Sequence, residues 1–285
     1  MRSISRPLRS VLYIPGSKAR ALEKARHLPT DAIIFDLEDA VAPDEKSAAR
    51  ALLAQELQVG GYGARLRIVR INGLSTPWGT QDAEAVVQMD ADAVLLPKVD
   101  AAEDLDALAR ITGDLPIWVM MESPSGMLAA AEIAAHPLCQ GMVMGTNDLA
   151  KDMGTRFRAD RMPLMAGLGL CVLAAKSEGI AIVDGVYNAF RDQEGLAREC
   201  EQGCDMGFDG KTLIHPAQLD VANAAFSPSG EDVELARRQI AAYNEALAKG
   251  QAVAVVDGRI VENLHVAMAH KTLAKMDAIE NLGTE

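Results

Sequence analysis

The chain has 285 residues, of which 49% are hydrophobic and 24% are charged, a composition typical of a folded globular protein. Its 28 Lys and Arg residues are outnumbered by 40 Asp and Glu residues, which gives a formal net charge of −12 at pH 7. A strongly negative surface repels a phosphate backbone, so nucleic acid is excluded as a general partner. A small anionic ligand still fits if the few basic residues gather in one cleft.

Neither a membrane span nor a signal peptide is predicted. The longest nearly uncharged stretch, residues 162–175, contains glycine and proline and is shorter than the ~20 apolar residues of a membrane helix. The basic N-terminus is followed by Val-Leu-Tyr-Ile-Pro-Gly, an apolar run too short for a signal peptide. We therefore expect a cytoplasmic protein with no membrane partner.

The four cysteines, Cys139, Cys171, Cys200 and Cys204, form no Cys-x-x-Cys pair and no Cys/His cluster. This spacing predicts buried thiols rather than a zinc site or a disulfide framework. Cys200 and Cys204 share one helix face at i, i+4, which favours packing over bridging.

Short apolar runs rich in Val and Ile alternate with Ala-, Leu- and Glu-rich stretches of helical spacing. Each run is apolar on both faces, as in a strand buried within a parallel sheet. The eight runs cover residues 10–15, 32–37, 67–72, 93–98, 117–122, 141–145, 181–184 and 207–214. Eight strand-then-helix units predict an α/β fold, the TIM (β/α)8 barrel, whose usual length is ~250 residues. A doubly wound open sheet is the alternative, but the first turn, Tyr-Ile-Pro-Gly-Ser, lacks the Gly-x-Gly-x-x-Gly pattern.

Helices are predicted to start near Pro43, Pro77, Ser125 and Gln193, with the third as one segment over residues 125–136. The residue composition changes at Phe226-Ser-Pro-Ser-Gly, a segment typical of a linker. Beyond it, helices are predicted over 233–249 and 261–280, with a short apolar run at 252–256. We expect a catalytic barrel over 1–225 and a C-terminal helical lid or oligomerisation segment over 226–285, because that tail is small for an independent core.

In such a barrel the catalytic groups follow the carboxyl ends of the strands. Charged or polar residues at these positions are Glu38, Asp39, Arg70, Asn72, Lys98, Glu122, Asn147, Asp148, Asp184, Lys211 and His215. Glu122 and Asp148 follow adjacent strands, and Mg²⁺ usually takes one or two carboxylates while substrate and water complete its shell. The pair predicts a Mg²⁺ site, for which Mn²⁺ can substitute. Capping of the two following helices is the alternative.

Arg70 is predicted to bind a substrate carboxylate or enolate, because guanidinium offers two parallel donors to such groups. A salt bridge to Glu38 or Asp39 is the alternative, and both can hold. Glu38 and Asp39 are adjacent in sequence, so their side chains must point in different directions. One of them is expected to face the barrel mouth, which is the opening at the carboxyl ends of the strands.

The other basic residues are predicted to contact the ligand or to act structurally. Lys98 suits substrate contact or an ion pair better than a Schiff base, since nearby carboxylates raise the pKa of an amine. His215 precedes Pro216 and is interpreted as a structural or ligand-edge histidine rather than a base. A basic cluster around the first strand is the expected entry point for a phosphorylated ligand, with a solvated terminus as the alternative; it comprises Arg2, Arg6, Arg9, Lys18 and Arg20.

Seven segments stand out in order along the chain: Ser10-Val-Leu-Tyr-Ile-Pro-Gly-Ser, Phe35-Asp-Leu-Glu-Asp-Ala-Val, Val69-Arg-Ile-Asn-Gly, Leu96-Pro-Lys-Val, Met121-Glu-Ser-Pro-Ser-Gly, Gly145-Thr-Asn-Asp-Leu and Leu213-Ile-His-Pro-Ala-Gln. In order and spacing they resemble the citrate lyase β-subunit-like family of the HpcH/HpaI aldolase superfamily, which includes malyl-CoA lyases. The resemblance runs from about residue 9 to 220, with a weaker tail to 280.

The resemblance implies a TIM barrel, Mg²⁺, an acyl-CoA substrate and a homo-oligomer, either a trimer or a hexamer. It makes Glu122 and Asp148 the metal ligands and Arg70 the substrate arginine. Glu38 and Asp39 match the family's acidic pair. The residues that fall where the family holds coenzyme A are Tyr13, Pro15, Gly16 and Lys18, and the tail matches the element that covers a neighbouring subunit's site.

The implied chemistry is a retro-Claisen cleavage of a malyl-CoA-like thioester to acetyl-CoA and a 2-oxo acid such as glyoxylate, or its reverse. Malyl-CoA lyases carry a tail aspartate as acid/base, but the matching stretch here places Glu262 at that position. One added methylene displaces a carboxylate by ~1 Å, which can lower a rate by ~10²-fold. The alternatives are a malyl-CoA thioesterase, with Glu262 or Glu38 as base, and a citrate lyase β subunit within a multi-enzyme complex.

Overall fold

The structure, a computed structural model, describes residues 6–282. The chain divides into two compact units, one over residues 8–226 and one over 227–282 together with residues 6 and 7. Within the described range, no helix combines the length and the apolar character needed to cross a membrane.

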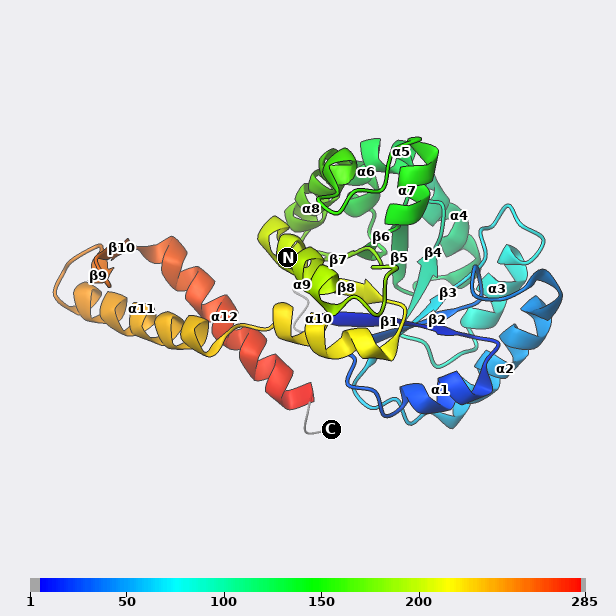
Figure 1. Cartoon of the computed structure of the whole chain (residues 1–285), viewed down its shortest axis with the longest axis horizontal. Coiled ribbons are helices and arrows are strands. Elements are labelled where there is room, and N and C mark those ends of the chain that lie inside the picture. The colour runs from blue at the N-terminus through cyan, green and yellow to red at the C-terminus, as the bar shows by residue number, and fades with distance from the viewer. Residues whose placement is uncertain (1–5, 283–285) are drawn as a thin grey trace. The chain divides into compact units, whose positions relative to one another are not determined.

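The first unit is a closed barrel of eight parallel strands in sequential order, enclosed by helices (Figure 1). The strands are β1 (Ser10–Pro15), β2 (Ala32–Asp36), β3 (Leu66–Arg70), β4 (Ala93–Leu96), β5 (Ile117–Met121), β6 (Cys139–Met144), β7 (Ala181–Asp184) and β8 (Gly210–Leu213). β1 pairs with both β2 and β8, so the sheet has no edge. The (β/α)8 prediction is confirmed, and the open-sheet alternative is wrong.

Helices follow each strand and cover the outside of the barrel. They are α1 (Ala19–Ala25), α2 (Lys46–Val59), α3 (Gly79–Val86), α4 (Ala102–Thr112), α5 (Pro124–Leu128), α6 (Ala130–Ala135), α7 (Thr146–Asp152), α8 (Met165–Glu178), α9 (Gln193–Met206) and α10 (Leu219–Ala225), with short 3₁₀ turns η1 (Pro43–Glu45), η2 (Met162–Leu164) and η3 (Pro216–Gln218). The single helix predicted over 125–136 is wrong. The chain leaves helical geometry at Ala129, where φ is −91° and ψ is 6°, and α6 begins there.

The strands bury two apolar layers. Alternate side chains fill the barrel interior, among them Val11, Ile34, Ile68, Leu95, Trp118, Val143 and Val183. The others pack against the helices in a larger core. The indole of Trp118 needs Gly141 opposite it, because a Cβ on Gly141 would lie 2.6 Å from the ring. With its interior filled, the barrel leaves its strand ends for a site.

An ionic network lies outside the barrel, between β7, β8 and α9. Lys211 Nζ contacts Glu199 at 2.6 Å and Asp184 at 3.2 Å. Arg161 Nη1 also contacts Asp184 at 2.7 Å. Lys211 and Asp184 therefore face the helices, and their placement among the barrel-mouth residues is wrong. Strand alternation turns Asp184 outward, since its neighbour Val183 lines the interior, and Lys211 is the register partner of Asp184 on β8.

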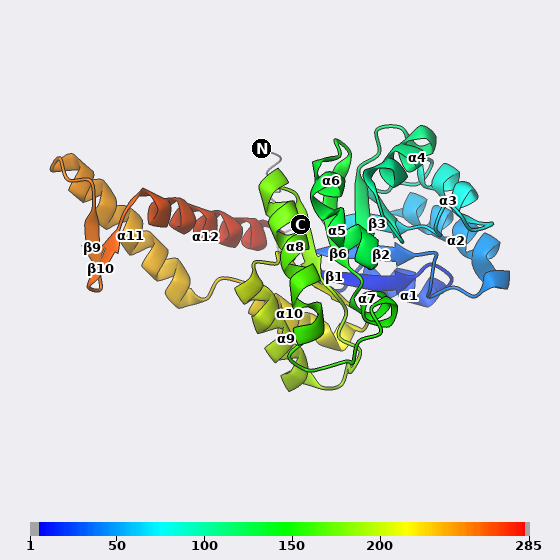
Figure 2. The same cartoon turned by 90° about the horizontal axis from the view of Figure 1, so that it is seen from above.

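The second unit contains α11 (Gly230–Ala248), β9 (Ala254–Val256), β10 (Arg259–Val261) and α12 (Asn263–Leu282). The two helices lie side by side, and β9 and β10 form an antiparallel hairpin (Figures 1 and 2). Its turn is Asp257-Gly258, with positive φ at both residues, as a tight hairpin requires. The tail helices were predicted, but β10 was missed although Asp-Gly is a hairpin signal.

Each of the four cysteines is a thiol, three of them buried and Cys204 half-buried. Cys200 and Cys204 share α9, as expected. The prediction of packed thiols is confirmed.

Candidate active site

Arg70 and Asp36 meet at the carboxyl end of the barrel. They are register partners on the neighbouring strands β2 and β3, so their side chains lie next to each other. Arg70 donates from Nε to Asp36 Oδ1 at 2.7 Å and from Nη2 to Asp36 Oδ2 at 2.6 Å. Burial alone would lower the pKa of Arg70, but Asp36 raises it well above its usual value. The guanidinium is therefore held, charged, at the barrel mouth.

Glu38 contacts the remaining terminal nitrogen of Arg70. Arg70 Nη1 lies 2.9 Å from Glu38 Oε2 and 3.6 Å from Asp39 Oδ2. Glu38 is mostly buried and Asp39 is exposed, so the two side chains differ in direction as expected. Burial raises the pKa of Glu38 to about 7, although Arg70 opposes this shift. A carboxyl group with a pKa near neutrality is suited to general base catalysis.

Tyr13 lies beneath the guanidinium, which sits 4.9 Å from the centre of its ring. Its hydroxyl donates to Met120 Sδ at 3.4 Å, and burial raises the pKa of the phenol. Tyr13 packs against the apolar interior of the barrel. Tyr13 therefore lies between the barrel interior and Arg70.

Glu122 and Asp148 converge on one cation, the ammonium of Lys98. Lys98 Nζ lies 2.7 Å from Asp148 Oδ1 and 3.5 Å from Glu122 Oε1. The backbone N–H of Lys98 donates to Glu122 at 2.8 Å, and its φ is 55°, a strained value for a non-glycine residue. Burial opposes the shift, but the hydrogen bond to Asp148 raises the pKa of Lys98. Lys98 is thus a protonated ion-pair partner, which argues against a Schiff base.

The two carboxylates suit a divalent cation. A Cβ on Gly145 would lie 2.7 Å from Glu122 Oε2, so glycine is needed there to admit the carboxylate. Ser123, and not Glu122, caps α5, while Asp148 lies in the first turn of α7. Among residues 6–282, no group of three or more His, Cys, Asp or Glu side chains could hold a metal. Two carboxylate ligands leave positions for substrate and water, which matches the way Mg²⁺ is usually bound.

The loop after β1 forms one wall of the mouth. Pro15 ends β1, and Gly16 lies so close to β2 that a Cβ would meet Leu37 at 2.9 Å. Lys18 is exposed, with its Nζ 3.8 Å from Glu45. Arg9 is bound to Asp31 before β1, at the opposite end of the barrel. The prediction of a single basic cluster around the first strand is therefore wrong, because β1 separates Arg9 from Lys18. Arg2 of that predicted cluster lies outside the described residues.

His215 has a structural role at the end of β8. Its Nδ1 accepts a hydrogen bond from the backbone N–H of Ala217 at 3.1 Å and so caps η3. Its ring stacks on Phe190 with 4.6 Å between the ring centres. His215 is exposed and Phe190 is half-buried.

Glu262 belongs to the second unit, where it is exposed between β10 and α12. Its backbone N–H donates to His265 Nδ1 at 3.2 Å, and its carbonyl accepts from the N–H of His265. It thus differs from the other predicted site residues, all of which lie in the barrel unit.

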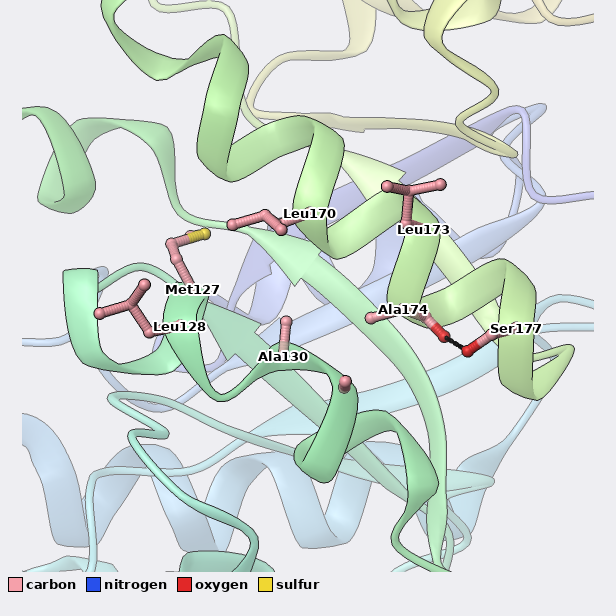
Figure 3. A pocket seen from close by; sticks show the side chains of 8 residues that line it. Met127, Leu128, Ala130, Leu170, Leu173, Ala174 and Ser177 are labelled. Carbon is pink, nitrogen blue, oxygen red and sulfur yellow. Dashed lines mark hydrogen bonds between the residues drawn. The ribbon is translucent and has the colours of Figure 1, made fainter.

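An apolar hollow lies on the outer helix layer, between α5, α6 and α8 (Figure 3). It is lined almost entirely by apolar side chains, including Met127, Leu128, Leu170 and Leu173. Ser177 is its only hydroxyl-bearing lining residue. Without charged groups, this hollow lacks the means for acid, base or metal chemistry.

Asp36, which contributes most to holding Arg70, is not among the predicted site residues. It lies within a strand predicted from its apolar residues. The available signal was its place in the alternation Ala32, Ile34, Asp36, where the first two line the barrel interior. A charged residue at an interior position near a strand's carboxyl end marks the mouth.

The sequence of the barrel unit identifies the family to which this chain belongs. Residues 9–216 match the family model for HpcH/HpaI aldolase/citrate lyase, and the chain belongs to this family. It is 67% identical over 273 residues to a (3S)-malyl-CoA thioesterase of Cereibacter sphaeroides, covering 96% of both chains. It is 34% identical to a citrate lyase subunit beta of Leuconostoc mesenteroides, covering 95% of this chain and 93% of that one.

A solved structure supports the same assignment. CitE from Mycobacterium tuberculosis, in complex with magnesium, acetoacetate and coenzyme A, matches with a TM-score of 0.81 and 30% identity. The match covers 96% of this chain and 99% of that one. The relatives are enzymes, and those with the higher identity carry the thioesterase name.

Proposed function

We propose that this protein is a (3S)-malyl-CoA thioesterase, which hydrolyses the thioester to malate and coenzyme A. The observation that carries the proposal is its 67% identity, over nearly the whole of both chains, to a protein named for that activity. The lyase reaction favoured by the sequence becomes the second candidate. Glu262 stands in place of the aspartate of malyl-CoA lyases, which is consistent with ranking the thioesterase reaction before the lyase reaction.

Hydrolysis requires a base and a donor for the developing oxyanion. Glu38 takes a proton from water as the water oxygen attacks the thioester carbon. The carbonyl oxygen becomes an oxyanion, which Arg70 Nη1 can stabilise. Collapse breaks the C–S bond, and the proton returns from Glu38 to the leaving thiolate. The pKa of Glu38, raised by burial to about 7, suits both transfers.

Glu122 and Asp148 are the residues that would hold Mg²⁺, which CitE binds in its complex. When bound, the ion supplies Lewis acidity and orients the substrate. With the ion bound, Lys98 would lose one or both of its carboxylate partners, Glu122 and Asp148. Because its side chain is about half exposed, it can turn toward the substrate's negative groups.

Coenzyme A is expected to lie along the loop after β1. Pro15, Gly16 and Lys18 form this side of the mouth, and Lys18 is exposed and suited to a phosphate. The stack of His215 on Phe190, at the end of the neighbouring strand β8, offers an aromatic surface for the ligand. Tyr13 is assigned to the acyl group because it lies under Arg70.

The experiment that tests the function separates the products. The purified protein is incubated with Mg²⁺ and (3S)-malyl-CoA, and CoA thiol, malate, acetyl-CoA and glyoxylate are measured. Equal amounts of CoA thiol and malate are expected. Glyoxylate with acetyl-CoA would establish the lyase instead, and activity only on a thioester of an acyl-carrier protein would favour a citrate lyase subunit.

The rate is expected to depend on the ionisation of Glu38. The carboxylate form acts as base, so kcat/KM should rise as pH increases through the pKa of about 7 and level off above it. Glu38→Gln should lower kcat by about 10²- to 10⁴-fold and remove this inflection. The companion variant is Glu262→Ala. If it removes the inflection while Glu38→Gln retains it, the base is Glu262.

The protein is proposed to be a homo-oligomer in which the second unit covers a neighbour's site. Exposed apolar side chains on this unit support an interface; among them are Val255, Ile260, Leu264 and Met268. Light scattering should give three or six times the 30.4 kDa chain mass. Ile260→Asp should reduce this mass, whereas Val59→Asp, at an equally exposed position on α2, should not. A wild-type monomer would refute the proposal.

A further inference from the structure

We propose that Asp36 is a positioning residue that presents one edge of Arg70 to the substrate and holds Glu38 beside it. The inference rests on the proposed function, because it assigns Asp36 a part in the same site. Its support is the set of contacts that the Asp36 carboxylate makes.

The hydrogen bonds of the Asp36 carboxylate are made with residues at the barrel mouth. Its oxygens accept the two Arg70 hydrogen bonds, and they also accept from the backbone N–H of Glu38 at 2.9 Å and of Ala40 at 3.1 Å. The side chain is almost fully buried. One carboxylate therefore fixes both the guanidinium and the start of the loop that carries Glu38.

This arrangement leaves Arg70 a defined free edge. The Nε and Nη2 fork, which binds carboxylates with two parallel donors, is occupied by Asp36. Nη1 contacts Glu38, so the donors left for a substrate oxygen are the second N–H of Nη1 and the second N–H of Nη2. The two-donor clamp expected from the sequence is thus used inside the protein, and the substrate receives the outer donors.

Asp36 also affects the charge state of Glu38. The groups that face Glu38 are Arg70 on β3, Asp36 on β2, Asp39 in its own loop and Glu122 after β5. Lys46 of α2 lies against its carbonyl at 2.7 Å, and Lys98 and Tyr13 are close enough to sense its charge. The negative charge of Asp36 raises the pKa of Glu38. Removing that charge should therefore lower it.

The same strand provides a matched control at its other end. Arg9 donates from Nε and Nη2 to Asp31 at 2.9 and 2.7 Å, and the backbone N–H of Arg9 donates at 2.8 Å. Asp31 is also almost fully buried. Both pairs should stabilise the fold similarly, but Asp31 precedes β2 and Asp36 ends it. Only Asp36 lies at the mouth.

The experiment compares Asp36→Asn with Asp31→Asn in the full-length enzyme. Asp36→Asn should lower kcat/KM by about 10²-fold and move the acidic inflection down by about one pH unit. Asp31→Asn should lower the melting temperature comparably, but leave kcat/KM within about threefold and the inflection in place. The pKa of Glu38 is also read directly, by ¹³C NMR of its carboxyl carbon without substrate.

The outcomes separate this inference from the proposed function. If wild-type protein does not hydrolyse (3S)-malyl-CoA, the function fails, while the NMR titration still tests Asp36. An unchanged Glu38 titration in Asp36→Asn, or an equal change in Asp31→Asn, overturns the inference. If Asp36→Asn does not fold, Asp36→Ser keeps an acceptor for the loop N–H groups and should shift the titration equally. In wild-type protein, rapid exchange of the Arg70 Nε proton would also overturn it.

Discussion

Glu122→Gln and Asp148→Asn are each expected to lower kcat by about 10³-fold, because losing either carboxylate weakens the binding of a divalent ion at the barrel mouth. Glutamine at position 122 can still accept the backbone N–H of Lys98, which now donates at 2.8 Å, so the fold should persist. The measurements are CoA release, Mg²⁺ titration by calorimetry and the circular dichroism spectrum. Loss of Mg²⁺ binding together with loss of turnover supports the metal site.

Glu199→Gln is the control for these variants. Glu199 accepts from Lys211 at 2.6 Å, much as Asp148 accepts from Lys98 at 2.7 Å, but it lies outside the barrel. Its substitution should lower stability, since it leaves a buried charge less compensated. It should leave kcat and Mg²⁺ binding near wild type. Full activity in either mouth variant would contradict the metal assignment.

Arg70→Lys is expected to lower kcat/KM by about 10²- to 10³-fold although it keeps the positive charge. An ammonium cannot bind both oxygens of Asp36 and also reach Glu38, as the guanidinium does at 2.6 to 2.9 Å. One of the two carboxylates is then left without its partner. We expect both kcat/KM and the free energy of unfolding to fall.

Arg9→Lys separates the two effects. Arg9 likewise donates from Nε and Nη2 to Asp31, at the amino ends of the barrel strands. Its substitution should reduce the free energy of unfolding in urea by an amount similar to that of Arg70→Lys, with kcat/KM unchanged. Equal losses of activity in both variants would show that Arg70 acts through stability alone.

Much of the site could be predicted because strand ends are readable in a sequence. Glu122, Asp148, Arg70 and Glu38 all follow apolar runs, and the barrel brings these points to one rim. The ion pair of Lys98 with a carboxylate was also expected, and the structure has it. The sequence did not predict which oppositely charged residue each of the other charged side chains contacts. Asp36 was overlooked, and Lys211 and Asp184 were placed at the mouth although they face α9.

The sequence by itself determined the eight strand-and-helix repeats, because period-2 alternation and helical spacing are local properties. These repeats in turn determined the barrel and the end of the barrel that carries the chemistry. The tertiary structure alone decided which charges meet. Strand register sets Asp36 beside Arg70, and strand orientation turns Lys211 outward. These contacts join residues far apart in the chain, whose pairing depends on the closure of the whole barrel.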